Sequence, residues 1–184
     1  MACRSTILID NFLSSSDFHS ISSRVESSAQ YNSDEMFDMR DDLWRDTNNL
    51  VFKRLKEINL YQEHFEEASK IASFSYNQFR PPNYAHGNMY GPHVDDGSYV
   101  FYIHPHWEES WEGKLKLTNA ENEEYRNGIF AKPNRFIWMN PSVMHDVSTT
   151  SLNAGHARVT NLGFLGASLH HDPVGVEYIN IITE

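Results

Sequence analysis

Residues 91–107 read GPHVDDGSYVFYIHPHW, in which three histidines and two aspartates lie beside a run of aromatic and β-branched residues. The run 98–103, SYVFYI, is typical of a buried strand. Side chains alternate between the two faces of a strand. His93 and Asp95 therefore point the same way and can bind one metal ion together, whereas Asp96 faces away.

The other two histidines of this stretch, His104 and His106, flank Pro105. Proline cannot donate a ladder hydrogen bond and marks the end or the edge of a strand. We therefore expect both to be surface histidines, although they share a face and could bind a metal adventitiously.

Short segments of the same β character continue from about residue 71 to the end of the sequence, separated by turn signals such as KPN, NP and NAG. Such spacing predicts a sandwich or a barrel-like double sheet. The earlier part reads as helical after a short strand at Thr6 to Ile9. One helix carries Phe18, Ile21 and Val25 on one face, a second runs from a cap at Asp42 to Ile58, and a third, shorter helix is expected over Glu63 to Ala72.

These patterns predict one α+β domain over residues 1–184 that is mainly β. Its helical part covers about 1–72 and packs on a mainly antiparallel β core of about 73–184. The formal charge of −10 disfavours nucleic acid as a partner, because basic side chains supply most of that affinity. The single cysteine and the absence of a long apolar run lead us to expect a cytoplasmic protein that does not bind membranes.

A third metal ligand is needed to make the H-x-D pair specific, and His145 in FIWMNPSVMHDVS is the best candidate. Two histidines and one carboxylate on β segments form the facial triad of non-heme Fe(II) oxygenases, which leaves positions open for dioxygen and a cosubstrate. Zinc is the rival metal, because the same donors serve in zinc hydrolases. No separate Glu stands beside these ligands in the H-E-x-x-H spacing of such enzymes.

Arg158 adds a second element. An oxygenase that splits dioxygen needs two further electrons, which a metal-chelating 2-oxo acid can supply, and the distal carboxylate of that acid needs a cationic anchor such as arginine. Arg158 follows His145 by thirteen residues, and the Asn-Ala-Gly turn at 153–155 can fold the chain back. We expect Arg158 on the strand beside His145, with Thr160 on the same face offering a hydroxyl. Without the triad, a surface β arginine would be the preferred interpretation.

With these residues, the sequence resembles the Fe(II)- and 2-oxoglutarate-dependent dioxygenases, and among them the prolyl 4-hydroxylase-like branch. The resemblance spans about residues 84–165. YAHGNMYGPHVDDG is similar to the pattern Y-x-x-G-x-x-Y-x-x-H-x-D, and FYIHPHW looks like a strand that ends in Tyr-Leu-Asn with a downstream Trp. WEGKLKL is similar to a Gly-Gly-x-Leu turn and strand, with Glu112 in place of the first glycine and Gly113 kept.

The resemblance implies a double-stranded β-helix, or jelly roll, with iron held by His93, Asp95 and His145. It also implies a 2-oxoglutarate pocket in which Arg158 and Tyr102 bind the tail carboxylate and Tyr84 lines the wall. Dioxygen, Fe(II) and 2-oxoglutarate would be required, with ascorbate as reductant. Asp95 is the carboxylate that related halogenases lack, and Phe164 stands where related nucleic-acid demethylases carry a second arginine.

We expect hydroxylation of a C–H bond, with a prolyl residue of a peptide or protein as the substrate. Two alternatives stay open. The substrate could be a free amino acid or another small metabolite, or the chain could be a non-catalytic metal-binding jelly-roll module.

Overall fold

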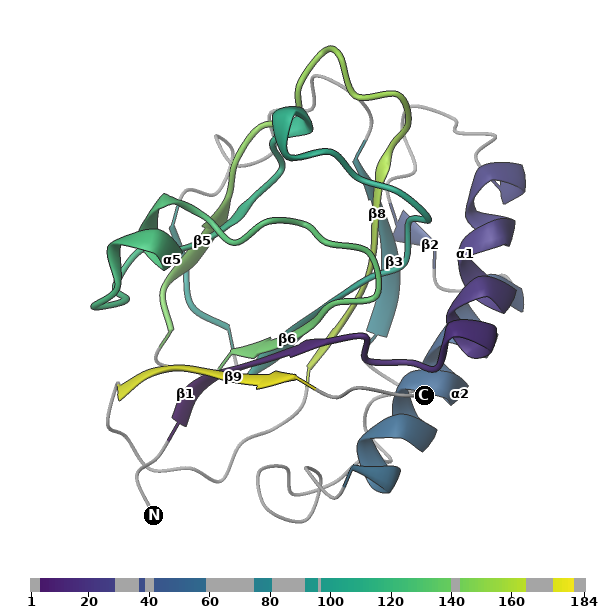
Figure 1. Ribbon diagram of the computed structural model, residues 1–184, viewed down its shortest axis with the longest axis horizontal. Coiled ribbons are helices and arrows are strands. Elements are labelled where there is room, and N and C mark those ends of the chain that lie inside the picture. Colours follow the sequence, from purple (N-terminus) through teal and green to yellow (C-terminus); the bar gives the residue numbers. More distant parts are fainter. Residues whose placement is uncertain are drawn as a thin grey trace.

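The computed structural model describes residues 4–28, 37–38, 42–58, 75–80, 92–95, 97–139, 143–164 and 174–180. The described strands form two sheets, and two helices pack beside the larger one (Figure 1). Its seven strands run in the order β2-β3-β8-β4-β6-β1-β9. These strands are β1 (Arg4–Asp10), β2 (Phe37–Asp38), β3 (Ser75–Arg80), β4 (Ser98–Tyr102), β6 (Phe136–Met139), β8 (Arg158–Phe164) and β9 (Val174–Asn180). All neighbours in this sheet are antiparallel except β1 and β9.

The second sheet consists of β5 (Leu115–Leu117) and β7 (His145–Val147). Isolated bridges widen it on both sides, because His93 pairs with His145 and Ile129 pairs with Leu115. The 3-10 helix η2 (Glu109–Trp111) precedes β5, and the short helix α5 (Glu123–Asn127) follows it. The α+β fold with a mainly antiparallel β core was therefore predicted correctly.

Alternation along the strands divides the apolar residues between two cores. On β4, Tyr99 and Phe101 face the helices, whereas Val100 and Tyr102 face the space between the sheets. The strands β1 and β6 alternate in the same way. The resulting inner core contains Leu8, Val100, Tyr102, Trp107, Leu115, Leu117, Ile129, Ala131, Ile137, Met139, Val143 and Ala154. This inner face is where the candidate site lies.

Two helices cover the outer face of the large sheet: α1 (Ser15–Ser28) and α2 (Asp42–Glu57). Both were predicted, and Ile21 and Val25 of α1 are buried in the outer core as their spacing indicated. Ser14 caps α1, since its hydroxyl accepts a hydrogen bond from the Asp17 amide at 3.1 Å. The predicted third helix, at 63–72, lies outside the described residues.

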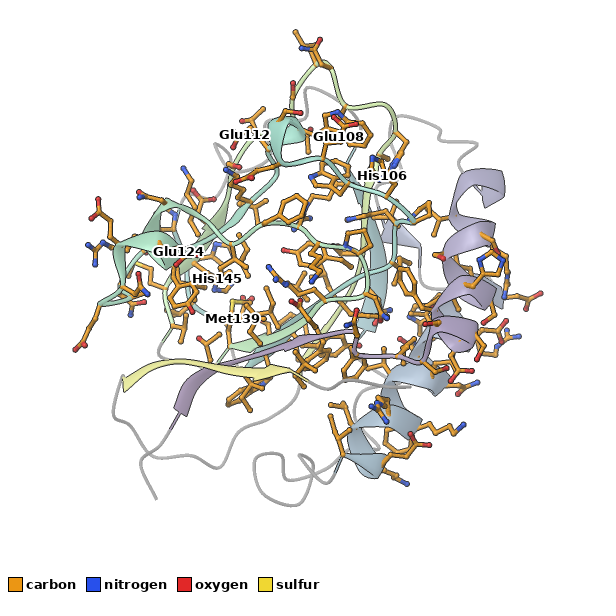
Figure 2. All side chains as sticks on the ribbon, viewed as in Figure 1. His106, Glu108, Glu112, Glu124, Met139 and His145 are labelled. Carbon is orange, nitrogen blue, oxygen red and sulfur yellow. The ribbon has the colours of Figure 1, made fainter. Side chains whose placement is uncertain are left out.

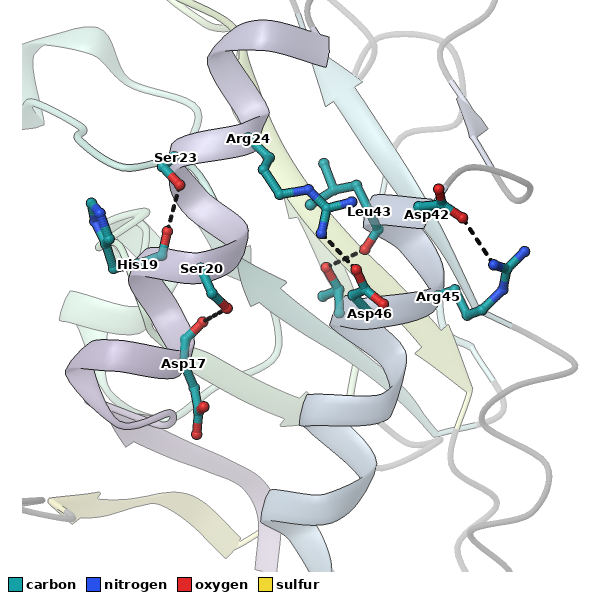
Figure 3. Close-up of polar contacts among 10 residues, drawn as sticks. Asp17, His19, Ser20, Ser23, Arg24, Asp42, Leu43, Arg45 and Asp46 are labelled. Carbon is teal, nitrogen blue, oxygen red and sulfur yellow. Dashed lines mark hydrogen bonds and ion pairs between the residues drawn. The ribbon is translucent and has the colours of Figure 1, made fainter.

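The polar contacts of α2 differ in depth. At the surface, Arg24 of α1 forms an ion pair with Asp46 of α2 at 2.6 Å (Figure 3), and exposed pairs of this kind stabilise little. In the interior, Asn48 of α2 accepts a hydrogen bond from Asn161 of β8 at 3.0 Å. That buried bond fixes α2 on the side of β8 away from the inner core.

Among the described residues, no helix has the length and apolar character needed to cross a membrane.

Candidate metal and cosubstrate site

His93 and His145 are brought together by the backbone. The His93 amide donates to the His145 carbonyl at 3.0 Å, and the His145 amide donates to the His93 carbonyl at 2.8 Å. Such a closely paired antiparallel bridge sets the two side chains on one face, and their ring centroids lie 4.5 Å apart. His145 also pairs with Leu117 of β5, whose side chain belongs to the inner core. The two imidazoles therefore share the inner side of the small sheet.

Asp95 completes the cluster. Its carboxylate oxygens lie 3.3 Å from Nε2 of His145 and 4.0 Å from Nε2 of His93. One donor atom from each of the three residues falls within 4.8 Å of the others, and no other such group of metal-binding side chains occurs among the described residues. The two side chains of the H-x-D pair thus lie together, as predicted, although only His93 makes a β bridge and residues 94–95 are not part of a strand.

The charge state of the cluster suits a cation. The hydrogen bond with His145 lowers the pKa of the Asp95 carboxyl below its usual range, and burial opposes this shift. Nδ1 of His145 lies 3.2 Å from the Val143 carbonyl, so an Nδ1–H group could donate to that carbonyl when Nε2 serves as a metal ligand.

The donor set fits Fe(II), because two imidazole nitrogens and one carboxylate oxygen make the facial arrangement that non-heme iron uses. His145 is 6 % exposed, whereas the side chain of His93 is 46 % exposed. The cluster therefore has one buried wall and one open side, which an incoming substrate would need.

Arg158 lies on the inner face of the large sheet with its side chain 1 % exposed. Its Nη2 donates to the hydroxyl of Tyr102 at 3.4 Å, and its Cζ lies 4.9 Å from the centre of that ring. Its Nε and the hydroxyl of Thr160 are buried, and neither has a hydrogen-bond partner in the described part of the chain. Within these same residues, no carboxylate forms an ion pair with the guanidinium. A buried cation without an anion is costly, so this arrangement is suited to an anionic ligand.

The side chain of Arg158 crosses from the large sheet toward the start of β5. There Gly113 has φ +67°, and a Cβ on it would lie 2.9 Å from Cδ of Arg158 and 3.1 Å from Cγ2 of Thr150. The missing side chain at this turn gives the arginine its path. The turn was noted in the sequence only through the resemblance of WEGKLKL to a glycine pair.

No known protein-family model matches the chain, and no curated protein matches it in sequence. In contrast, the crystal structure of a Pseudomonas putida prolyl 4-hydroxylase matches it with a TM-score of 0.55 over 89 % of this chain and 92 % of that chain. The two proteins share a fold. Their sequence identity is 14 %, so the likeness extends to the fold alone.

The expected position of Arg158 was wrong in detail. Arg158 was expected on the strand beside His145, but β7 pairs with β5 in the small sheet, whereas β8 lies between β3 and β4 in the large one. The turn at 153–155 therefore carries the chain from one sheet to the other. His145 and Arg158 project from opposite sheets toward the same inner core.

The assignment of His104 to the surface was also wrong. His104 is 0 % exposed, and both of its ring nitrogens are hydrogen-bonded to backbone groups, those of Ala131 and Val159. His106 is exposed as expected, lies near Glu108 and is well apart from His145 in Figure 2. His104 lies beyond the end of β4, and its burial depends on backbone groups of two other segments.

Two residues of interest, Tyr84 and Asp96, lie outside the described residues. The expected role of Tyr84 in the cosubstrate pocket and the outward direction of Asp96 stay predictions.

Proposed function

We propose that the chain is an Fe(II)- and 2-oxoglutarate-dependent dioxygenase that hydroxylates a C–H bond, and that its two sheets are those of a double-stranded β-helix. One observation supports this most strongly: a His-Asp-His cluster at the small sheet lies across the inner core from a buried arginine of the large sheet, which has no carboxylate partner among the described residues. A metal site by itself would not need such an arginine, whereas an enzyme that also binds a dicarboxylate needs a cationic partner for it.

In this proposal His93, Asp95 and His145 hold the iron. Bound iron with 2-oxoglutarate and dioxygen supplies the oxidising power for hydroxylation, while the cosubstrate becomes succinate and carbon dioxide. Ascorbate would keep the iron reduced. The protein's own residues bind and orient the cosubstrate and the substrate, and they exclude water from the site.

The cosubstrate contacts follow from the polar groups on the inner face. Arg158 binds the tail carboxylate through Nε and an Nη atom, which offers the parallel donors that a carboxylate accepts. Tyr102 donates from its hydroxyl, because that oxygen already accepts from Arg158. Thr160 pairs with Tyr102 across β4 and β8, and its unpartnered hydroxyl can add a further bond. The apolar side chains of the inner core exclude water from this end of the cosubstrate.

We propose a prolyl residue of a peptide or protein as the substrate, on the likeness in fold to a prolyl 4-hydroxylase. The chain is proposed to act in the cytoplasm, as a single domain, with no nucleic-acid or membrane partner.

The test is turnover of 2-oxoglutarate. Purified protein with Fe(II), ascorbate and 2-oxoglutarate should form succinate faster when proline-containing peptides are added. His93→Ala should abolish this reaction, whereas His106→Ala, which removes an exposed histidine outside the cluster, should leave it unchanged. If free amino acids stimulate succinate formation and peptides do not, the substrate is a small metabolite. An iron-loaded protein that turns over neither class, and whose folding collapses in His93→Ala, would be a structural metal-binding module.

A further inference from the structure

His104 is a buried polar side chain to which the metal cluster and the dicarboxylate contacts assign no task. Its ring lies between two aromatic neighbours, 5.7 Å from the ring centre of Tyr102 and 5.0 Å from that of Trp107. A histidine with no exposed surface is uncommon, and keeping it there requires partners for both nitrogens.

Those partners lie on two separate segments. Nε2 lies 2.8 Å from the Ala131 carbonyl, and Nδ1 accepts a hydrogen bond from the Val159 amide at 3.2 Å. One neutral tautomer, with the proton on Nε2, satisfies both bonds at once. Burial lowers the pKa of His104 to about 3, and the nearby charge of Arg158 acts in the same direction. The ring is therefore neutral at physiological pH.

The bond to Val159 occurs where the strand ladder stops. The last residue pair between β4 and β8 is Tyr102 with Thr160, and one more backbone bond joins the Ile103 amide to the Val159 carbonyl at 3.1 Å. The Val159 amide belongs to the peptide unit that joins Arg158 to Val159. Because the histidine ring accepts from this amide, it fixes the orientation of the peptide unit from which the arginine side chain starts.

The bond to Ala131 ties the same point to a second segment. The stretch 131–135 is already held to Tyr102, whose amide donates to the Arg135 carbonyl and whose carbonyl accepts from the Asn134 amide, both at 3.0 Å. His104 thus joins the backbone that carries Tyr102 to the backbone that carries Arg158.

We infer that His104 is a positioning residue for the dicarboxylate pocket: its two ring nitrogens hold the β4 end, the 131–135 segment and the Arg158–Val159 peptide in the relative positions that bring Arg158 against Tyr102. This inference rests on the proposed function. It makes a prediction that a merely structural role does not. Loss of the two hydrogen bonds should weaken the binding of the dicarboxylate more than the binding of the metal.

The experiment uses Mn(II), which does not start turnover, in place of iron. Mn(II) binding is measured from the signal of free Mn(II), and 2-oxoglutarate binding to the Mn(II)-loaded protein is measured by equilibrium dialysis. His104→Leu removes both bonds, His104→Asn can keep one, and His104→Gln can keep both, since its amide offers one donor and one acceptor. Asn48→Leu is the control, because it removes a buried hydrogen bond to β8 on the helix side of the sheet.

We expect His104→Leu to raise the dissociation constant of 2-oxoglutarate about tenfold or more while that of Mn(II) stays within about twofold. His104→Asn should lie between His104→Leu and the wild type, which keeps the comparison usable if His104→Leu does not fold. His104→Gln should keep most of the affinity for 2-oxoglutarate. Asn48→Leu should lose thermal stability but keep its affinity for 2-oxoglutarate.

The inference would be overturned if His104→Leu and Asn48→Leu weakened 2-oxoglutarate binding equally. It would also be overturned if His104→Leu and His104→Asn left the affinity for 2-oxoglutarate unchanged. Failure of His104→Gln to restore binding would overturn the role of the two hydrogen bonds. If the wild-type protein loaded with Mn(II) binds no 2-oxoglutarate, the proposed function itself is wrong, which is a different result from either of these.

Discussion

Arg158 and Tyr102 form a buried pair on the inner face of the large sheet, with the guanidinium carbon 4.9 Å from the ring centre and Nη2 donating to the hydroxyl at 3.4 Å. The pair is polar but has no negative charge. Attraction to the ring offsets part of the cost of burying a cation, but much less than a carboxylate would. In the absence of ligand this site should reduce the stability of the protein.

Arg158→Met is predicted to have opposite effects on stability and on binding. Removing a buried charge that has no carboxylate partner among the described residues should raise the free energy of unfolding of the ligand-free protein by about 1 kcal/mol or more. The same change should weaken the binding of 2-oxoglutarate about a hundredfold, because the charged hydrogen bonds to its tail carboxylate are lost. Urea denaturation and equilibrium dialysis measure the two effects. A less stable Arg158→Met protein would mean that the guanidinium has an anionic partner within the protein.

Gly113→Ala is predicted to disturb the same pocket from the other sheet. A Cβ there would meet Cδ of Arg158 at 2.9 Å, on a backbone with φ +67°. We expect a loss of about 1 to 3 kcal/mol in the free energy of unfolding, together with weaker 2-oxoglutarate binding.

Gly128→Ala is the matched control for Gly113→Ala. Gly128 also has positive φ, +126°, and its Cβ would meet Cβ of Lys114 at 2.7 Å, away from Arg158. It should destabilise the protein without changing 2-oxoglutarate affinity. If both variants reduce affinity equally, the effect reflects general strain and not displacement of the arginine.

The sequence carries local information about the site more clearly than long-range information. The shared face of Arg158 and Thr160 follows from strand geometry alone, and the H-x-D spacing correctly grouped His93 with Asp95 although only His93 makes a β bridge. Which strands become neighbours depends on the whole fold, and this is why Arg158 was expected beside His145 although they lie on opposite sheets.

The misassignment of His104 has a similar cause. Pro105 correctly indicated the end of a strand, which the structure places at Tyr102. It could not indicate that the chain beyond that end stays buried, since burial of the ring depends on Ala131 and on Val159, which is 55 residues away. Trp107, which also packs in the inner core, was the available sign that the chain continues inward.

The pH dependence of stability should carry the signature of His104. Its folded pKa of about 3 lies below the value of about 6.5 in an unfolded chain, so the unfolded state binds the proton first as pH falls. The contribution of the neutral His104 to the free energy of unfolding is complete above about pH 6.5. It is lost as the pH falls toward 3, at about 1.4 kcal/mol per pH unit. Urea denaturation of the wild type and of His104→Gln at several values from pH 7 to pH 4 isolates this effect from that of the carboxylates. The stability of the wild type should fall relative to that of His104→Gln as pH falls; parallel curves would show that the pKa of His104 is not lowered in the folded protein.

Glu112→Gly is predicted to stabilise the protein. Glu112 has φ 57° and ψ −137°, a conformation that glycine adopts readily and that a side chain makes costly. Its carboxylate lies 4.0 Å from Nζ of Lys114 in a half-exposed ion pair, which contributes little. Its backbone carbonyl accepts from Nε1 of Trp107 at 2.9 Å, a bond that any residue can keep. We expect the free energy of unfolding to rise by about 1 kcal/mol in Glu112→Gly and not in Glu112→Ala, which removes the ion pair but keeps the strain. A gain in both variants would assign the effect to the carboxylate, and a loss in Glu112→Gly would mean that the ion pair with Lys114 outweighs the backbone strain.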